Sequence, residues 1–350
     1  MVMGQLTAGG AEGQLWEVTR GIDRSRFDPV VYSLSPQIQP IGEMLMQGGV
    51  PLRVTDQRGW HRVRWLADSL AADGVQVVHA WLYIANAVTW AARWFGGTYP
   101  MITSARNCKV QGCLSQVTNT LAFRSSRAIV ANSNDVAAYI VRHYRAPRDR
   151  IQVIYNGIDS ERFHPGGRNG ARDLGLIVAI GRLVEQKNHA LFLQAAARLA
   201  QDVKTARFMI VGDGPLRSAL EMQARSLGIV DRVTFTGERR DVETVLRSAS
   251  LFWLTSRWEG MPNAVLEAMA SGVPAIATDV GGTRELIRSG VDGFVVPEGD
   301  IEAFLARSRD LLRDEARRRQ FAAAARARAE EFSSARMVAA MSQLYEEVLS

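Results

Sequence analysis

Apolar runs alternate with segments of helical periodicity along most of the 350-residue chain. Each run is short and is bounded by turn-prone residues, which is typical of a buried strand in a parallel sheet. Between the runs, apolar residues recur at helical spacing. The strand runs lie at residues 2–6, 30–32, 51–54, 75–79, 101–104, 128–131, 151–154, 177–180, 208–211, 250–255, 273–277 and 294–296. We therefore expect an α/β protein whose parallel sheets carry helices on both faces.

This alternation is interrupted once, shortly after Phe163. Gly, Pro and Asn residues gather there, as in an exposed linker, and the strand pattern restarts at residues 177–180. A chain of this length suffices for two domains. We expect a first domain over residues 1–165, a second over 166–332 and a last amphipathic helix over 333–350.

The stretch from Trp258 to Glu267, WEGMPNAVLE, places two carboxylates eight positions apart around a predicted helix start. Pro262 suits a first helical turn, because its missing N–H would have no partner there. A helix N-terminus attracts phosphate through its backbone N–H groups and its dipole. Glu259 and Glu267 suit the paired hydroxyls of sugars. The stretch predicts a site for a diphosphate flanked by two sugars, while an ordinary turn with solvated glutamates is the alternative.

Other motifs follow in a fixed order along the chain. They are GGAE at 9–12, NGID at 156–159, GRLVEQKN at 181–188, VGDGP at 211–215, FTGERRDV at 235–242 and VGGTRELI at 280–287. Together with the two glutamates, an E-x7-E signature, they resemble glycosyltransferase family 4, the retaining group 1 enzymes with the GT-B fold. The resemblance covers nearly the whole chain. It implies two Rossmann-like domains that face each other across a cleft, with the last helix crossing back to the first domain.

The resemblance also implies a donor site, mainly in the second domain. Glu259 would hold hydroxyls of the donor hexose, and Glu267 those of the ribose. Arg182 and Lys187 follow a predicted strand end, and their cations suit a diphosphate better than a solvated loop. The other expected donor contacts are Gly10, Gly181, Gly212, Gly214, Glu238, Arg239, Gly260, Met261, Pro262, Asn263 and Val265.

The acceptor is expected on the first domain. His79 closes the strand predicted over residues 75–79, and Arg106 and Asn107 follow the next strand, at the edge where open α/β sheets bind ligands. His79 is therefore a candidate catalytic or acceptor-side group, with a hydrogen-bonded structural histidine as the alternative. Relatives often carry a histidine after a W-x-Y run, where this chain has Ile84. Arg106 is expected to contact the acceptor or a phosphate, with a plain surface arginine as the alternative.

Charge is distributed unevenly between the two halves. Residues 1–165 hold 17 Lys+Arg against 12 Asp+Glu, net +5, and residues 166–350 hold 25 against 24, net +1, which sum to the +6 of the chain. A basic first half would attract an anionic acceptor, such as a lipid-linked diphosphate sugar at the inner membrane surface. No basic helix, and no basic strand with interleaved aromatic residues, indicates a nucleic-acid partner.

Other features of the sequence bear on where the protein is located and on whether it uses a metal ion or a disulfide. No apolar run approaches ~18 residues, so we expect a cytoplasmic protein that meets the membrane only at its surface. Cys108 and Cys113 match neither a redox pair nor a zinc site and are expected to be reduced thiols. Metal-dependent transferases hold their ion with clustered carboxylates, and no D-x-D occurs in the chain, so no metal and no other cofactor is expected.

The function that the resemblance implies is retaining transfer of a hexosyl group to an acceptor hydroxyl. The donor would be a UDP-sugar or a GDP-sugar such as GDP-mannose, and the pathway cell-envelope, exopolysaccharide or glycolipid synthesis. Two alternatives stay open. One is a GT-B sugar-nucleotide epimerase, and the other is a protein that binds a nucleotide sugar without catalysis.

Overall fold

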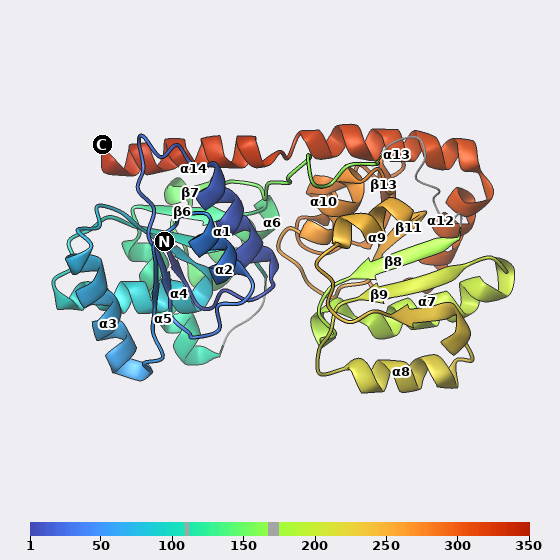
Figure 1. The fold of residues 1–350 in the computed structure, drawn as a ribbon, viewed down its shortest axis with the longest axis horizontal. Helices are drawn as coiled ribbons and strands as arrows, with labels where there is room; N and C mark the ends of the chain where they lie inside the picture. Colours follow the sequence, from blue (N-terminus) through green and yellow to red (C-terminus); the bar gives the residue numbers. More distant parts are fainter. Residues whose placement is uncertain (109–111, 167–174) are drawn as a thin grey trace. The chain divides into compact units, whose positions relative to one another are not determined.

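A computed structural model describes residues 1–108, 112–166 and 175–350, which form two compact units (Figure 1). Unit 1 comprises Met1–Gly157 and Ser334–Ser350, and unit 2 comprises Ile158–Ser333. The first unit ends at Gly157 and not at residue 165, because Ile158 donates its N–H to the carbonyl of Phe332 in unit 2 (2.8 Å). Residues 167–174 of the expected linker lie outside the described residues.

Unit 1 contains a seven-stranded sheet in the order β3-β2-β1-β4-β5-β6-β7, and all neighbouring strands are parallel, as predicted. Its strands are β1 (Val2–Met3), β2 (Val31–Ser33), β3 (Leu52–Val54), β4 (Val78–Trp81), β5 (Met101–Ala105), β6 (Ala128–Ala131) and β7 (Ile151–Val153). Its α-helices are α1 (Gly10–Gly21), α2 (Ile41–Gln47), α3 (Gly59–Ala72), α4 (Leu82–Ala92), α5 (Cys113–Ser125), α6 (Asn134–Tyr144) and α14 (Ser334–Leu349). Short 3-10 helices are η1 (Arg93–Phe95) and η2 (Arg148–Arg150).

Alternating strand residues divide the interior of unit 1 into cores on the two sides of the sheet. Met3 and Trp81 pack with α1, α2 and α14, whereas Val2 and Ala80 pack with α3 and α4. In Figure 1, α14 runs alongside α1. The apolar stripe of α14 enters the first of these cores through Met337, Met341, Leu344 and Val348. The last helix of the chain is thus an integral part of unit 1.

Strand β4 runs over Val78–Trp81, so the prediction that a strand ends at His79 was wrong. The strand pairs with β1 on one side and β5 on the other, and its residues Ala80 and Trp81 are fully buried. Gly74, with φ +60°, lies in the turn that precedes it. His79 therefore lies inside a central strand.

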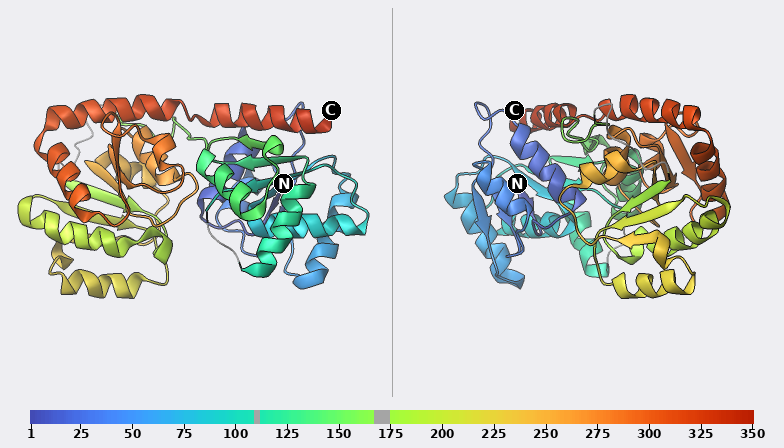
Figure 2. Two further views of the ribbon diagram at one scale, coloured as in Figure 1. Left: turned by 180° about the vertical axis from the view of Figure 1, so that it is seen from behind. Right: turned by 45° about the vertical axis from the view of Figure 1, so that its right-hand side comes forward.

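Figure 2 shows unit 2 in two further views. Its six-stranded sheet has the order β10-β9-β8-β11-β12-β13, again with every neighbouring pair parallel. Its strands are β8 (Leu176–Ile180), β9 (Arg207–Val211), β10 (Val233–Phe235), β11 (Leu251–Leu254), β12 (Ala275–Thr278) and β13 (Gly293–Val296). Its α-helices are α7 (His189–Asp202), α8 (Arg217–Ser226), α9 (Val242–Ser248), α10 (Asn263–Ala270), α11 (Thr283–Leu286), α12 (Ile301–Arg313) and α13 (Glu315–Glu330). The 3-10 helices are η3 (Glu185–Lys187) and η4 (Val230–Arg232).

Aromatic residues fill the centre of the unit 2 core. Trp253 of β11 is fully buried, and its indole N–H donates to the Ser308 hydroxyl (3.0 Å). The rings of Phe192, Phe208 and Phe304 lie around it at centroid distances of 5.3, 6.0 and 5.6 Å. This packing fixes β11, whose carboxyl end leads into the WEGMPNAVLE stretch.

Helices of membrane-spanning length and apolarity do not occur within residues 1–108, 112–166 and 175–350.

Candidate active site

The carboxyl ends of the unit 2 strands lie at one edge of the sheet, which is where ligands bind in open α/β folds. The loops after β8 and β9 are joined there by backbone hydrogen bonds from Gly181 to Val211 and from Leu183 to Asp213, both 2.9 Å. The loop after β11 joins them, because Arg257 donates its N–H to Gln186 (2.8 Å). The sequence motifs GRLVEQKN, VGDGP and WEGMPNAVLE therefore come together in one place.

Glycines permit the close approach of these loops. A Cβ on Gly212 would lie 2.1 Å from the carbonyl oxygen of Gly181, and a Cβ on Gly214 would lie 2.7 Å from that of Leu183. A Cβ on Gly181 would lie 3.2 Å from the side-chain carbons of Lys187. The absence of side chains at Gly212 and Gly214 thus lets the loop backbones pack against one another, and the Lys187 side chain lies against Gly181.

Lys187 and Glu259 form the central contact of the site. Lys187 Nζ lies 2.6 Å from Glu259 Oε1, with the two side chains 21% and 7% exposed. The cation comes from η3 and the carboxylate from the loop after β11, so the sheet topology brings together residues separated by 72 positions. Being partly buried, the pair is less screened by salt than a surface pair. A fixed cation and a fixed carboxylate thus occupy the predicted donor site.

Two further residues, neither of them predicted as a site residue, orient the Glu259 carboxylate. The hydroxyl of fully buried Ser256 donates to Glu259 Oε1 (2.7 Å). Gln186 Nε2 donates to the carbonyl of Trp258 (3.0 Å) and lies 3.5 Å from Glu259 Oε2. Ser256 belongs to no motif, and Gln186, although it lies in the GRLVEQKN motif, was not expected to contact Glu259.

The loop after β12 supports the loop that carries Glu259. Gly282 donates its N–H to the carbonyl of Gly260 (2.6 Å). Gly281 has φ +52°, and a Cβ on it would lie 2.4 Å from the carbonyl oxygen of Glu259 and 2.6 Å from that of Gly260. The VGGTRELI motif therefore packs against the backbone of the WEGMPNAVLE stretch.

Helix α10 begins at Asn263, so Pro262 is its N-cap residue and not its first residue. Met261 and Pro262 are buried, while Asn263 is partly exposed. The side chain of Val265 is fully buried, and its N–H donates to the Pro262 carbonyl (3.1 Å). The N-terminus of α10 therefore directly follows the loop that carries Glu259 and Gly260.

Glu267, one turn into α10, is partly buried. Burial raises the pKa of the Glu267 carboxyl to about 7, although the cations of Arg162 and Lys187 act in the opposite direction. A carboxyl with such a pKa changes its charge near neutral pH.

Other predicted donor residues lie around these loops. Arg182 is exposed at the start of the GRLVEQKN loop. Glu238 is exposed on the loop after β10, where Arg239 donates to Asp241 (2.8 Å). Gly10 belongs to unit 1, where it is exposed and begins α1.

His189, at the first position of α7, was not predicted. It is 4% exposed, and burial lowers its pKa to about 4, so the ring is neutral at pH 7. The Lys187 cation also lowers the pKa of His189, while the carbonyls of Gly181 and Arg182 act in the opposite direction. The residue type alone does not predict this burial, because histidine is only intermediate in how often it is buried.

His79 is an interior residue of unit 1, in agreement with the structural alternative. It is 2% exposed, and its ring nitrogens lie 2.8 Å from the Tyr345 hydroxyl and 2.6 Å from the Ser104 hydroxyl. Burial, followed by the nearby Arg106 cation, holds the pKa of His79 well below its ordinary value. A neutral imidazole whose two nitrogens are both engaged ties α14 to β4 and β5.

Arg106 is also buried, contrary to the surface arginine considered from the sequence. Its guanidinium carbon lies 4.0 Å from the centroid of the Trp81 ring, and Nη1 donates to Asn156 Oδ1 (2.8 Å). Burial lowers the pKa of Arg106 to about 9. Asn107 is partly exposed, and its carbonyl accepts from the Tyr83 hydroxyl (3.0 Å). Of the predicted acceptor-side residues, only Asn107 reaches the surface to any extent.

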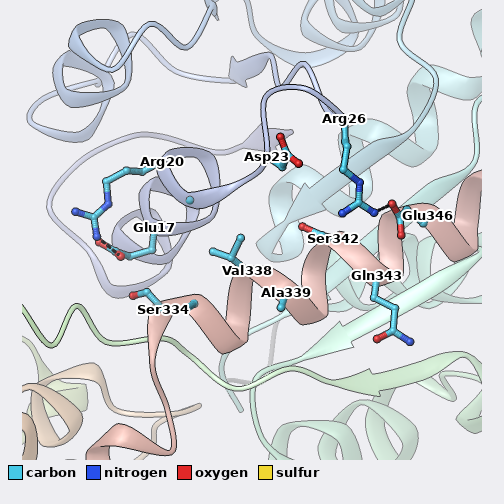
Figure 3. A pocket seen from close by; sticks show the side chains of 12 residues that line it. Glu17, Arg20, Asp23, Arg26, Ser334, Val338, Ala339, Ser342, Gln343 and Glu346 are labelled. Atoms are coloured by element: carbon cyan, nitrogen blue, oxygen red, sulfur yellow. Dashed lines mark hydrogen bonds and ion pairs between the residues drawn. The ribbon is translucent and has the colours of Figure 1, made fainter.

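A separate pocket of about 570 Å³ lies within unit 1 between α1 and α14 (Figure 3). Arg20 pairs with Glu17 and Arg26 pairs with Glu346 along its walls. No residue of the predicted donor or acceptor sites lines it.

Within residues 1–108, 112–166 and 175–350, no group of three or more His, Cys, Asp and Glu side chains is arranged to hold a metal ion. Among the predicted donor residues, the cations are those of Arg182, Lys187 and Arg239, and the carboxyl groups are those of Glu238, Glu259 and Glu267.

Sequence comparison assigns both halves to known families. Residues 8–162 match the model for "Glycosyltransferase Family 4", and residues 168–328 match that for "Glycosyl transferases group 1". The chain is 33% identical over 193 residues to the UDP-Gal:alpha-D-GlcNAc-diphosphoundecaprenol alpha-1,3-galactosyltransferase of Escherichia coli, covering 52% of this chain and 50% of that protein. It is 32% identical over 285 residues to a D-inositol 3-phosphate glycosyltransferase of Rhodococcus opacus, covering 73% of this chain and 64% of that protein. The matches thus span about half to under two thirds of these relatives' lengths.

Solved structures share the fold over nearly the whole chain. HepE of Anabaena, in complex with UDP-glucose, superposes with a TM-score of 0.88 at 20% identity, covering 99% of this chain and 98% of that one. The sucrose-phosphate synthase of Thermosynechococcus elongatus gives 0.83 at 18% identity, with coverages of 99% and 96%. Two parallel-sheet Rossmann-like units and these matches identify the GT-B fold. With family models matching each half in turn, the chain belongs to the group 1 glycosyltransferases, glycosyltransferase family 4.

Proposed function

We propose that this protein transfers a sugar from a UDP-sugar to an acceptor hydroxyl, with retention of anomeric configuration and without a metal ion. The observation that carries the proposal is the contact between Lys187 and Glu259 (2.6 Å), directly before the N-terminus of α10. A cation and a helix N-terminus suit a diphosphate, and a carboxylate beside them suits sugar hydroxyls.

The chemistry requires stabilisation of the leaving group. When the bond between the sugar C1 and the β-phosphate oxygen breaks, negative charge develops on that phosphate. Lys187 and the α10 N-terminus are preorganised charges or donors for it, and each such group contributes about 3–4 kcal/mol by analogy with oxyanion holes. The exposed Arg182 is a further cation within the same loop. The acceptor hydroxyl then bonds to C1 on the face that the phosphate leaves and gives its proton to the departing phosphate. This route gives retention and needs no protein nucleophile.

A uridine donor is favoured by the names of related proteins. The E. coli relative is named for UDP-galactose, and HepE structures contain UDP, UDP with glucose, or UDP-glucose. Another relative is a Vi polysaccharide biosynthesis protein of Salmonella typhi, 34% identical over 174 residues. We therefore place this protein in polysaccharide or glycolipid synthesis.

The acceptor is proposed to be anionic and lipid-linked. The first half of the chain carries the excess of positive charge, 17 Lys+Arg against 12 Asp+Glu in residues 1–165. The E. coli relative is named for a diphosphoundecaprenol acceptor. A basic surface would raise the local concentration of such an acceptor.

A panel of UDP- and GDP-sugars tests the donor assignment, with binding followed by calorimetry and turnover by release of the nucleoside diphosphate. We expect binding of a UDP-sugar and UDP release that rises when a lipid-diphosphate sugar is added. The anomeric coupling of the product, measured by NMR, reports retention. Conversion of UDP-N-acetylglucosamine without an acceptor would instead identify an epimerase, and binding without any turnover a binding protein.

Chelation is expected to leave activity intact. Because side chains and a helix end supply the positive charge at the donor diphosphate, turnover in EDTA should equal turnover in its absence. The measurement is UDP release with and without EDTA, followed by addition of Mn²⁺ or Mg²⁺. Loss of activity in EDTA with recovery on adding Mn²⁺ would refute the metal-free route.

Donor affinity is expected to rise with pH around neutrality. The pKa of Glu267 is raised to about 7 by burial, and its ionised form is the better acceptor for ribose hydroxyls. Affinity should therefore be lost as pH falls through that value, by about tenfold between roughly pH 8 and pH 6. Calorimetric titration of UDP-glucose measures the profile. Glu267→Gln should bind more weakly and show a flat profile, and an unchanged slope in that variant would contradict the assignment.

A further inference from the structure

Two consecutive hydroxyl residues, Thr255 and Ser256, join the carboxyl end of β11 to the donor site. Both are buried, at 2% and 0% exposure. The Thr255 hydroxyl donates to the backbone carbonyl of Lys187 (3.0 Å), and the Ser256 hydroxyl donates to Glu259 Oε1 (2.7 Å). Each of the two residues is thus bonded to one partner of the contact between Lys187 and Glu259.

The backbone around Ser256 is held by two neighbouring segments. Strand β11 pairs with β12, and Thr278 at the end of β12 donates its hydroxyl to the Ser256 carbonyl (2.7 Å). The next residue, Arg257, donates its N–H to the carbonyl of Gln186 on η3 (2.8 Å). The Ser256 hydroxyl therefore reaches Glu259 from a position that the sheet and η3 determine.

The two oxygens of the Glu259 carboxylate have different surroundings. Oε1 accepts from both Lys187 Nζ (2.6 Å) and the Ser256 hydroxyl (2.7 Å). Oε2 lies 3.5 Å from Gln186 Nε2, which is a long contact, and that amide also donates to the Trp258 carbonyl (3.0 Å). A carboxylate oxygen can accept two hydrogen bonds. Within the parts of the chain that the structure describes, Oε1 is therefore saturated, and Oε2 keeps the capacity to accept from a ligand hydroxyl.

Lys187 alone would not fix which oxygen is offered to the ligand. The terminal torsion of a glutamate side chain has a broad range, and an ammonium group has three donors that it can also direct to phosphate oxygens. Ser256 has a short side chain on a buried backbone, so it gives Glu259 a second contact that does not move with the lysine. The same contact keeps Oε1 hydrogen-bonded, as a buried carboxylate requires.

We propose that Ser256 is a positioning residue for the donor sugar, because it holds Glu259 Oε1 so that Oε2 accepts a hydroxyl of the hexosyl group. Thr255 acts on another part of the donor, since it fixes the backbone of Lys187, the cation for the diphosphate. Neighbouring hydroxyls thus control recognition of the sugar and of the phosphate separately. The inference rests on the proposed function through the assignment of Glu259 to the sugar and of Lys187 to the diphosphate.

Calorimetric affinities for UDP and for a UDP-sugar separate the two roles. The UDP-sugar is UDP-glucose or UDP-galactose, whichever binds the wild type more tightly. Ser256→Ala should leave the affinity for UDP unchanged and weaken the UDP-sugar by about tenfold, the effect of losing one hydrogen bond to a charged group. Thr255→Val, which has nearly the same shape, should weaken both ligands alike. The same profile in the two variants, or unchanged UDP-sugar binding in Ser256→Ala, would overturn the inference.

A double-mutant cycle tests whether Ser256 acts through Glu259. In a Glu259→Gln background, Ser256→Ala should cause little further loss of UDP-sugar affinity, because the oriented carboxylate is already absent. Full additivity of the two changes would contradict the inference. Ser126→Ala is the matched control, since this serine of unit 1 is also fully buried and donates to the Ala122 carbonyl (2.7 Å). It should lose thermal stability and still bind both ligands like the wild type.

Transfer rates distinguish a failure of this inference from a failure of the proposed function. Ser256→Ala should lower kcat/KM for the UDP-sugar by about tenfold, in line with its loss of affinity. A wild type that binds the UDP-sugar but never transfers it would refute the transferase activity, while the binding comparison would still decide the role of Ser256. An active wild type matched by Ser256→Ala in binding and transfer would refute the inference alone. Circular dichroism and thermal unfolding verify that the variants are folded.

Discussion

Lys187→Ala is expected to lower the rate of glycosyl transfer by about 10²–10³-fold, the effect of removing one preorganised donor from a developing oxyanion. Lys187 Nζ is a partly buried cation 2.6 Å from Glu259, and its side chain is held over Gly181. Its charge is therefore fixed in place before the donor binds. Arg182→Ala should cause a smaller loss, because that side chain is exposed and must be ordered by the phosphate.

Lys187→Gln separates the electrostatic role of Lys187 from its structural one. The glutamine amide can still donate to Glu259 but carries no charge, so this variant should keep the loop intact and still lose turnover. Lys204→Ala, at an exposed lysine of the same unit, is the matched control and should behave as wild type. Rates of UDP release and melting temperatures decide the outcome. Full turnover in Lys187→Gln would show that the charge is not used.

The proximity of the motifs GRLVEQKN and WEGMPNAVLE could be predicted because parallel strands place their carboxyl ends at one edge of the sheet. GRLVEQKN and WEGMPNAVLE each follow a strand run, so Lys187 and Glu259 had to lie near each other once β8 and β11 were neighbours. The motifs themselves do not specify the order of the strands in the sheet. The sheet of unit 2 provides that order and places β8 directly beside β11.

The acceptor side was less predictable because its contacts are long-range. His79 was placed at a strand end from the local run of apolar residues, but pairing of Val78 with Met101 and of Trp81 with Ser104 extends β4 beyond it. Its partner Tyr345 lies 266 positions away in sequence. Arg106 was expected to contact the acceptor or a phosphate, with a plain surface arginine as the alternative, yet it is buried against the Trp81 ring and Asn156. No local pattern encodes such pairs.

Residues that hydrogen-bond to a predicted site residue cannot be identified from the sequence, for a related reason. Ser256 is a short polar residue among turn residues, and its role depends on the exact course of the loop between β11 and α10. Loop courses are fixed by packing against other loops, here the one that carries Gly281 and Gly282. The VGGTRELI motif could be noticed from the sequence, but its contact with Glu259 and Gly260 could not.

Gly281→Ala is expected to impair both donor binding and turnover, although Gly281 has no side chain to contact a ligand. Its φ of +52° strains any L-residue, and an added Cβ would lie 2.4 Å from the carbonyl oxygen of Glu259. The Glu259 loop must move to relieve this overlap, and a displacement of about 1 Å at a reacting site costs about 10²-fold in rate. The strain should also lower the free energy of unfolding, by about 1–3 kcal/mol.

Gly299→Ala distinguishes the displaced loop from simple backbone strain. Gly299 has φ +78°, and no atom lies within 4 Å of the position that its Cβ would take. This variant should lose a similar part of its stability through φ alone, of the order of 1 kcal/mol, and should transfer sugar at the wild-type rate. Steady-state kinetics at saturating and limiting UDP-sugar, beside denaturant unfolding of both variants, make the comparison. A Gly281→Ala protein that is destabilised like Gly299→Ala but fully active would show that the loop after β12 does not set the position of Glu259.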